Sequence, residues 1–350
     1  LAVLEEILRL DQFDNETGAP RSGGDGRPDF ADEQFVFLAD QANMPYGNYS
    51  AAGKRSLLVE LVLKDSLFLL GAPAAAGPQV TSPVGDRTPV KAIVIACNTA
   101  TAYGEAEIEQ LIREAGLDVP VISVIEVGAE ATIEALSTTG EGAVGVLATC
   151  GTVASGAYPA AIGAVARQRG RKPVCVVQQG SVGLAGAIDG LPEFVLPQAP
   201  AGRPRSEYLG PSLVHEQAPI ESALLPRYGF DFSQGRMVWE GTAAQPTALQ
   251  INSLENYVAY ETVSLLETLR NQPGAQPLVA VVLGCTHFPY VAPVFHEKLR
   301  QLYDYQENGR YVYRSVLAPD HGCIDPGEYL ARRLYAVLAA GSKRRKAGDA

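Results

Sequence analysis

Two cysteines stand in settings where a thiol could do acid–base chemistry. Cys97 follows the apolar run Ala92–Ala96, and Cys285 follows a similar run that ends at Gly284. Thr99 comes after Cys97 with one Asn between them, and Thr286 follows Cys285 directly. A lone cysteine at a strand end is usually a small buried apolar residue, which is our interpretation of Cys150, Cys175 and Cys323. Two matched settings in one chain instead favour a functional pair.

A thiolate and a thiol together can invert a carbon centre. One group removes a proton from one face, and the other delivers a proton from the opposite face. Free cysteine has a pKa of about 8.5, which oriented N–H dipoles can lower toward neutrality. The strand-to-helix loops after the two cysteines should expose Asn98, Thr99 and Thr286, which could hold a substrate carboxylate. The pattern predicts proton transfer at a carbon next to a carboxylate, with no cofactor.

Apolar strand candidates alternate with helical stretches, which is typical of a parallel α/β sheet. Two similar units of this kind, each with a cysteine at a strand end, predict two doubly wound, mainly parallel-sheet α/β domains. Because ligands bind outside the carboxyl ends of parallel strands, the active site is expected in a cleft between the domains. The predicted strands are 35–39, 92–96, 121–125, 143–148, 174–177 and 278–283. The predicted helices are 1–10, 106–115, 129–136, 155–168, 254–269 and 326–338.

Composition excludes several classes of function. The formal charge of −11 argues against a nucleic-acid groove, which would need clustered Lys and Arg. The five cysteines form no Cys-x-x-Cys pair and the four histidines have no metal-ligand spacing, so neither a metal site nor a disulfide framework is predicted. No apolar run is long enough to cross a membrane, and no secretion signal is present. We therefore expect a reduced cytoplasmic protein without a membrane or nucleic-acid partner.

At both cysteines the sequence resembles the cofactor-independent aspartate/glutamate racemase superfamily, and within it the glutamate racemases most. The first motif is Ala96-Cys-Asn-Thr-Ala100, and the second is Leu283-Gly-Cys-Thr-His-Phe-Pro289. The resemblance implies racemisation of L-glutamate to D-glutamate for peptidoglycan precursors, by two cysteines acting at the α-carbon. It also implies that no cofactor is used and that the protein forms a homodimer.

The resemblance extends to weaker matches that imply further site residues. Pro45, Tyr46 and Gly47 match a turn that touches the substrate. Thr149 and Thr152 match threonines that donate to the substrate carboxylate, although capping a helix near Ser155 explains them nearly as well. His287 is expected to protonate or orient Cys285, or to contact the substrate ammonium. The implied first domain is 1–118 plus 296–350, and the second is 119–295 with an insertion at about 191–247 of unassigned fold.

Two departures from the family keep alternatives open. The family's N-terminal Asp-Ser-Gly loop is missing before the uncapped helix that begins at Leu1, so we expect a segment upstream of it. Gln178 and Gln179 stand where an acidic residue often follows a strand of the second domain. The alternatives are an aspartate racemase, another isomerase or decarboxylase of small acids, and an inactive acid-binding paralogue. The loop-like stretches 14–27 and 71–88 carry no predicted function.

Overall fold

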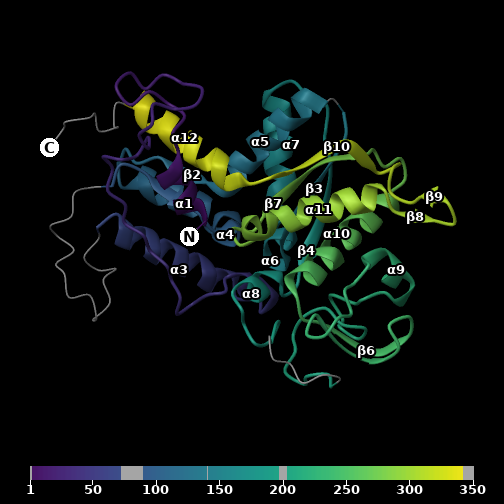
Figure 1. Cartoon of the computed structure of the whole chain (residues 1–350). Coiled ribbons are helices and arrows are strands. Elements are labelled where there is room, and N and C mark those ends of the chain that lie inside the picture. The colour runs from purple at the N-terminus through teal and green to yellow at the C-terminus, as the bar shows by residue number, and fades with distance from the viewer. Residues whose placement is uncertain (1, 72–89, 140, 197–202, 342–350) are drawn as a thin grey trace. The chain divides into compact units, whose positions relative to one another are not determined.

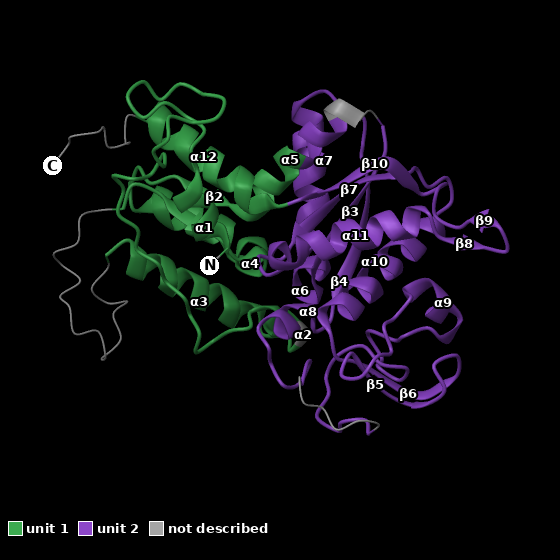
Figure 2. Cartoon of the chain, viewed as in Figure 1, with its two compact units in different colours: residues 1–131, 325–350 green, residues 132–324 purple. Residues whose placement is uncertain are grey.

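The computed structural model describes residues 2–71, 90–139, 141–196 and 203–341 (Figure 1). The chain divides into two compact units (Figure 2). The first unit, unit 1, contains residues 1–131 and 325–350, and the second, unit 2, contains residues 132–324. Each unit combines parallel strands with helices, so each is an α/β structure.

The sheet of unit 1 consists of two parallel strands in its described part. Strand β1 (Ile93–Ile95) pairs with β2 (Val121–Ser123), and α4 (Asn98–Glu114) connects them. One apolar cluster joins the two terminal segments of this unit to β2, through α1 (Ala2–Arg9) and α12 (Pro326–Ala340). Its buried members include Val3, Ile7, Ile122, Leu330 and Leu334.

A second cluster in unit 1 lies around β1 and holds α2 (Gly47–Ala51) and α3 (Arg55–Leu69) beside α4. Helices α3 and α4 approach closely at Gly104, where a Cβ atom would lie 2.7 Å from Cγ1 of Val62. Only glycine leaves room for that contact, so this position fixes how α4 packs, and α4 begins at the residue after Cys97.

Unit 2 contains a four-stranded parallel sheet in the order β10-β7-β3-β4. The strands are β3 (Ala143–Thr149), β4 (Cys175–Ser181), β7 (Leu278–Gly284) and β10 (Leu317–Ile324). All seven residues of the central strand β7 are buried, which explains its unbroken apolar sequence. The edge strand β10 is exposed in its middle and carries Asp320 and His321 there.

Helices before, between and after these strands complete unit 2 (Figure 1). Helix α10 packs against β4 and is capped by Ser253, whose side chain accepts from the Asn256 N–H. The helices are α5 (Val124–Thr139, which begins in unit 1), α6 (Cys150–Ser155), α7 (Ala157–Gln168), α8 (Leu184–Ile188), α10 (Leu254–Arg270), η4 (Phe288–Val291) and α11 (Ala292–Tyr303).

The described part of the stretch 191–247, to which the sequence analysis assigned no fold, adds a small lobe to the core of unit 2. Its buried residues, among them Leu224, Tyr228 and Met237, join the same apolar cluster as β7 and α10. The lobe contains η3 (Ser222–Leu224), α9 (Leu225–Tyr228) and an antiparallel pair of strands, β5 (Met237–Gly241) and β6 (Pro246–Ile251). A second short antiparallel pair, β8 (Gln306–Glu307) and β9 (Arg310–Tyr311), lies outside the lobe and precedes β10 in the sequence.

Most predicted strands and helices are confirmed to within a few residues, but three details are corrected. The predicted strand 35–39 is wrong, because these residues form no ladder in the described structure and Phe35, Val36 and Phe37 are exposed. Helix α4 begins at Asn98 and not near residue 106. The predicted helix 155–168 is divided at Gly156, whose φ of +68° belongs to the left-handed region. The predicted loop 71–88 lies outside the described residues except for Gly71.

The two-domain α/β class is confirmed, while the predicted domain boundaries near 118 and 296 stay a prediction. The compact units change over later in the sequence, at 131 and 324. The reason is strand pairing: β2 pairs with β1 of unit 1, and β10 pairs with β7 of unit 2. Among the helices of the described residues, none is long and apolar enough to cross a membrane.

Candidate active site

Cys97 lies at the junction of β1 and α4. Its backbone is extended, and its Sγ accepts from the Ala100 N–H at 3.5 Å, so the thiol caps the helix. Burial raises the pKa of the Cys97 thiol, and the N–H groups of Ala100 and Thr99 act in the opposite direction. Because burial is the larger of these effects, it favours the neutral thiol of Cys97, which could act as a proton donor.

Asn98 and Thr99 do not lie in an exposed loop, and that expectation is corrected. They form the first turn of α4 and are only 4% and 3% exposed. The turn begins at once because the Cys97 side chain itself accepts from the third residue on, as an N-cap does. Both residues therefore belong to the N-terminal turn of a 17-residue helix, directly after Cys97 in the sequence.

The Pro45-Tyr46-Gly47 turn lies in the same part of unit 1. Tyr46 is buried in the apolar cluster that Cys97 borders, Pro45 follows a cis peptide bond, and Gly47 begins α2. The Tyr46 Oη lies 2.7 Å from Oδ2 of Asp40 and 2.9 Å from Oδ2 of Asp65. Burial raises the pKa of the Asp65 carboxyl, as does the Asp40 charge, although the Tyr46 hydrogen bond lowers it. This pair of carboxylates holds the ring in place.

In unit 2 the predicted residues gather at one edge of the sheet. Strands β3, β4 and β7 are parallel, and Ala148 of β3 pairs with both Gly180 of β4 and Gly284 of β7. Their carboxyl ends therefore lie together, with Thr149 on β3 and Cys285 directly after β7. This is the edge where parallel α/β sheets bind ligands.

Cys285 belongs to a chain of three polar side chains at that edge. It is 6% exposed, and its Sγ lies 3.6 Å from Nδ1 of His287. The Nε2 of the same ring lies 3.2 Å from Oδ2 of Asp189, which follows α8. Thr286, which separates Cys285 from His287 in the sequence, is partly buried. Sequence reasoning did not find Asp189, because it stands almost a hundred positions from His287 in no recognisable motif.

Thr149 caps α6, which begins at Cys150 and not near Ser155, where the alternative interpretation placed the capped helix, and Thr152 lies inside α6. Thr149 is the N-cap and accepts from the Thr152 N–H at 3.3 Å, and the two hydroxyl oxygens lie 3.0 Å apart. Thr152 is 1% exposed. Capping and substrate binding can coexist for Thr149, since its hydroxyl stands at the same sheet edge as Cys285.

The glutamines that replace the family's acidic residue lie on β4. The Nε2 of Gln179 donates to Oε2 of Glu261 at 3.0 Å. Glu261 comes from α10 and is fully buried, and this burial raises the pKa of its carboxyl to about 7. Sequence reasoning treated this stretch of α10 only as a helix, so Glu261 was missed.

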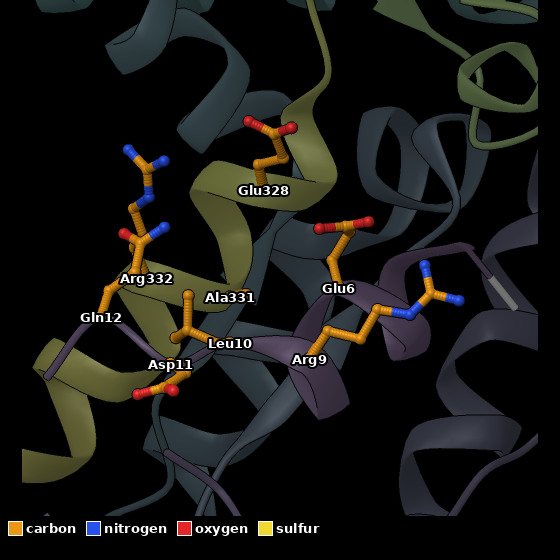
Figure 3. A pocket seen from close by; sticks show the side chains of 8 residues that line it. All are labelled: Glu6, Arg9, Leu10, Asp11, Gln12, Glu328, Ala331 and Arg332. Atoms are coloured by element: carbon orange, nitrogen blue, oxygen red, sulfur yellow. The ribbon is translucent and has the colours of Figure 1, made fainter. Parts of the chain in front are cut away.

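A polar pocket elsewhere in unit 1 contains none of the predicted site residues. It lies along α1 and α12, and Figure 3 shows side chains of both charges around it. Glu6 and Arg9 come from α1, and Glu328 and Arg332 come from α12. Burial and the Glu328 charge raise the pKa of Glu6. Because no thiol lines it, this pocket offers no counterpart to the chemistry predicted for the cysteines.

Curated proteins that are similar to this chain in sequence include glutamate racemases. No family model matches the chain. It is 35% identical over 170 residues to a glutamate racemase of Limosilactobacillus fermentum, covering 47% of this chain and 53% of that protein. It is 37% identical over 134 residues to one of Latilactobacillus sakei, covering 38% and 39%. The chain thus spans about half the length, or less, of the curated relatives it matches.

Solved structures resemble the whole chain in fold. A glutamate racemase isoform of Bacillus anthracis matches with a TM-score of 0.54 and 19% identity, covering 98% of this chain and 78% of that one. A glutamate racemase of Francisella tularensis, in complex with D-glutamate, matches with a TM-score of 0.51 and 16% identity over the same shares. Because these sequence identities are below 20%, the two structures are evidence for the fold alone.

The fold defines the structural class of the protein: it is a two-domain α/β protein with the fold of the solved glutamate racemases. Within that class, the two curated relatives described above, from Limosilactobacillus fermentum and Latilactobacillus sakei, are both named glutamate racemase. The resemblance predicted from the two cysteine motifs is therefore confirmed.

Proposed function

We propose that this protein is an amino-acid racemase that interconverts L- and D-glutamate by proton transfer between the α-carbon and two cysteines. One observation carries the proposal. Cys97 and Cys285 occupy similar places in their own units, because each closely follows a parallel strand: Cys285 comes directly after β7, and Ala96 alone separates Cys97 from β1. A threonine follows each cysteine, directly in the case of Cys285 and after Asn98 in the case of Cys97. The curated relatives of the chain bear the name of this activity.

The two sulfur environments suit opposite roles at the start of a turnover. Burial favours the neutral thiol at Cys97, which makes it the proton donor. Cys285 stands beside the His287 ring, which can take its proton and leave a thiolate as the base. Cys285 removes the α-proton from one face, and Cys97 protonates the opposite face. Each sulfur then has the protonation state that the other began with, so the reverse reaction runs through the same two groups.

The α-proton becomes acidic enough only if the charge that develops on the carboxylate is stabilised. We propose that Asn98 and Thr99 provide donors on the Cys97 side, together with backbone N–H groups of the first turn of α4, to which both residues belong. In our proposal Thr286, Thr149 and Thr152 provide donors on the Cys285 side. Pro45, Tyr46 and Gly47 form a wall that excludes water.

The remaining features of the proposal follow from the relationship to the racemases. The substrate is a small acidic amino acid, no cofactor takes part, and the D-glutamate product serves peptidoglycan precursors. We further propose two domains near 1–118 with 296–350 and 119–295, a homodimeric state, a cytoplasmic location and no nucleic-acid or membrane partner.

Deuterium exchange tests the function directly. In deuterated water, the protein with L-glutamate should incorporate deuterium at the α-carbon and form D-glutamate, as followed by proton NMR and chiral chromatography. The variants Cys97→Ala and Cys285→Ala should each lose inversion by about 10²-fold or more, because each lacks one of the two proton-transfer groups.

Two matched controls separate loss of chemistry from loss of structure. Cys175→Ala removes a thiol of β4 and should keep full activity. L-Aspartate, assayed in parallel, should react more slowly than glutamate. Absence of exchange with glutamate, aspartate and other small diacids would contradict the proposal, as would inversion by both single-cysteine variants.

A further inference from the structure

We infer that Asp189 is a positioning residue for His287, fixing the ring so that its Nδ1 serves the Cys285 sulfur. A role for Asp189 in catalysis rests on the proposed function. The contacts of His287 with Asp189 and Cys285 lie within unit 2 and do not depend on that function. Asp189 belongs to no recognised motif of the sequence.

The inference begins with the two nitrogens of one imidazole ring. The His287 Nε2 lies 3.2 Å from Oδ2 of Asp189, and its Nδ1 lies 3.6 Å from Sγ of Cys285. In neutral imidazole one nitrogen carries hydrogen and the other has a lone pair. A carboxylate can only accept, so Asp189 selects the form with hydrogen on Nε2. That form presents the Nδ1 lone pair to the thiol.

The carboxylate also stabilises the ring after it has taken the thiol proton. The proton moves from Sγ of Cys285 to Nδ1, and the ring becomes an imidazolium with both nitrogens donating. Its positive charge then lies between the thiolate on one side and the Asp189 carboxylate on the other. The pair is partly exposed, with side chains 27% and 51% accessible, so solvent weakens the effect without removing it.

The fold holds Asp189 at this place through α8. Leu184 and Ala187 of this short helix are buried in the core of unit 2, and the helix packs against α10 and η4, the latter following His287 directly. Asp189 then forms the C-cap, where a carboxylate meets the unfavourable end of the helix dipole. The contact with His287 offsets part of that cost when the ring carries the thiol proton.

The neighbouring strand β4 supplies no acid that could take this role. Gln179 of β4 is an amide and is hydrogen-bonded to Glu261, which is fully buried in α10. Asp189, ten residues after Gln179, is the carboxylate that the described structure places on the ring of His287.

The experiment compares Asp189→Asn with the parent protein. We expect the ¹⁵N shifts of His287, assigned with His287→Gln, to show hydrogen on Nε2 in the parent protein and a mixture of tautomers in the variant. Alkylation of Cys285 by iodoacetamide at pH 7, followed by mass spectrometry of its peptide, should slow by about 2- to 5-fold, the range expected for a partly exposed ion pair. For glutamate, kcat should fall while KM changes little.

Two further variants make the result specific. Asp189→Glu keeps the charge and should restore much of the alkylation rate, and Glu193→Gln removes a carboxylate from the same segment and should change nothing. If Asp189→Asn leaves the tautomer and the alkylation rate unaltered, the inference is overturned even where the protein racemises glutamate. If both change as expected but no amino acid exchanges, the inference stands and the proposed function fails.

Discussion

At the scale of single residues, the two thiols show what a sequence reveals of a site. The Cys97 and Cys285 motifs were found because type, spacing and strand context coincide, and both cysteines lie at strand ends. Asp189 and Glu261 were not found, because their importance comes from neighbours distant in sequence. Burial, which decides whether a thiol or a carboxyl keeps its proton, is a property of the packed structure and has no local signature.

Glu261 leads to a prediction about stability and pH. Its pKa is raised from the ordinary 4.5 to about 7 by burial, so the folded protein holds this proton more tightly than the unfolded chain does. Stability from this group is complete below pH 4.5 and is lost as the pH rises through about 7. Between pH 5 and pH 8, Glu261→Gln should therefore lose less stability than the parent protein, by up to about 3 kcal/mol.

Urea unfolding at the two pH values measures this difference. Glu240→Gln replaces an exposed carboxyl of β5 in the same unit and should leave the pH dependence as it is in the parent protein. Equal losses of stability in Glu261→Gln and the parent protein would show that Glu261 ionises normally in the folded state.

At the scale of elements, buried strands were predictable and exposed ones were not. β3 and β7 are covered on both faces, so they read as continuous apolar runs. β10 carries Asp320 and His321 in its exposed middle, so no such run marked it. Helix α3 was missed for a related reason: its run of leucine and valine has apolar residues on all sides and lacks a clear helical period.

The end of β7 gives a prediction at this scale, because Gly284 immediately precedes Cys285. A Cβ atom there would lie 2.9 Å from Cε2 of Tyr158 and 3.1 Å from the carbonyl oxygen of Leu147. Tyr158 is fully buried and cannot move aside. Gly284→Ala should therefore destabilise the protein by about 1–3 kcal/mol and change the alkylation rate of Cys285.

A glycine of the neighbouring strand provides the control for this prediction. At Gly322 of β10, a Cβ atom would have no other atom within 4 Å, so Gly322→Ala should be tolerated. Urea unfolding measures both variants. Equal stability of the two variants would mean that the end of β7 can shift to accept a methyl group.

At the scale of the whole molecule, the two units differ in how much structure supports each thiol. Unit 2 has a four-stranded sheet and one large apolar cluster that also takes in the 191–247 lobe. The described part of unit 1 has a two-stranded sheet between two smaller clusters. The alternation of strands and helices predicted the α/β class, but not this inequality, because pairing partners are set by tertiary contacts.

This inequality predicts that the two units unfold separately. The single tryptophan, Trp239 of β5, packs edge-on against Phe232 at 5.6 Å, so its fluorescence reports on unit 2 alone. Circular dichroism reports on the helices of both units. On addition of urea, we expect the dichroism signal to begin falling before the fluorescence changes. The reason is that unit 1, which has the smaller apolar clusters, should unfold at a lower urea concentration than unit 2. Gly284→Ala should move the fluorescence transition to lower urea and leave the earlier one in place. Coincident transitions in the parent protein would instead show that the chain folds as one cooperative unit.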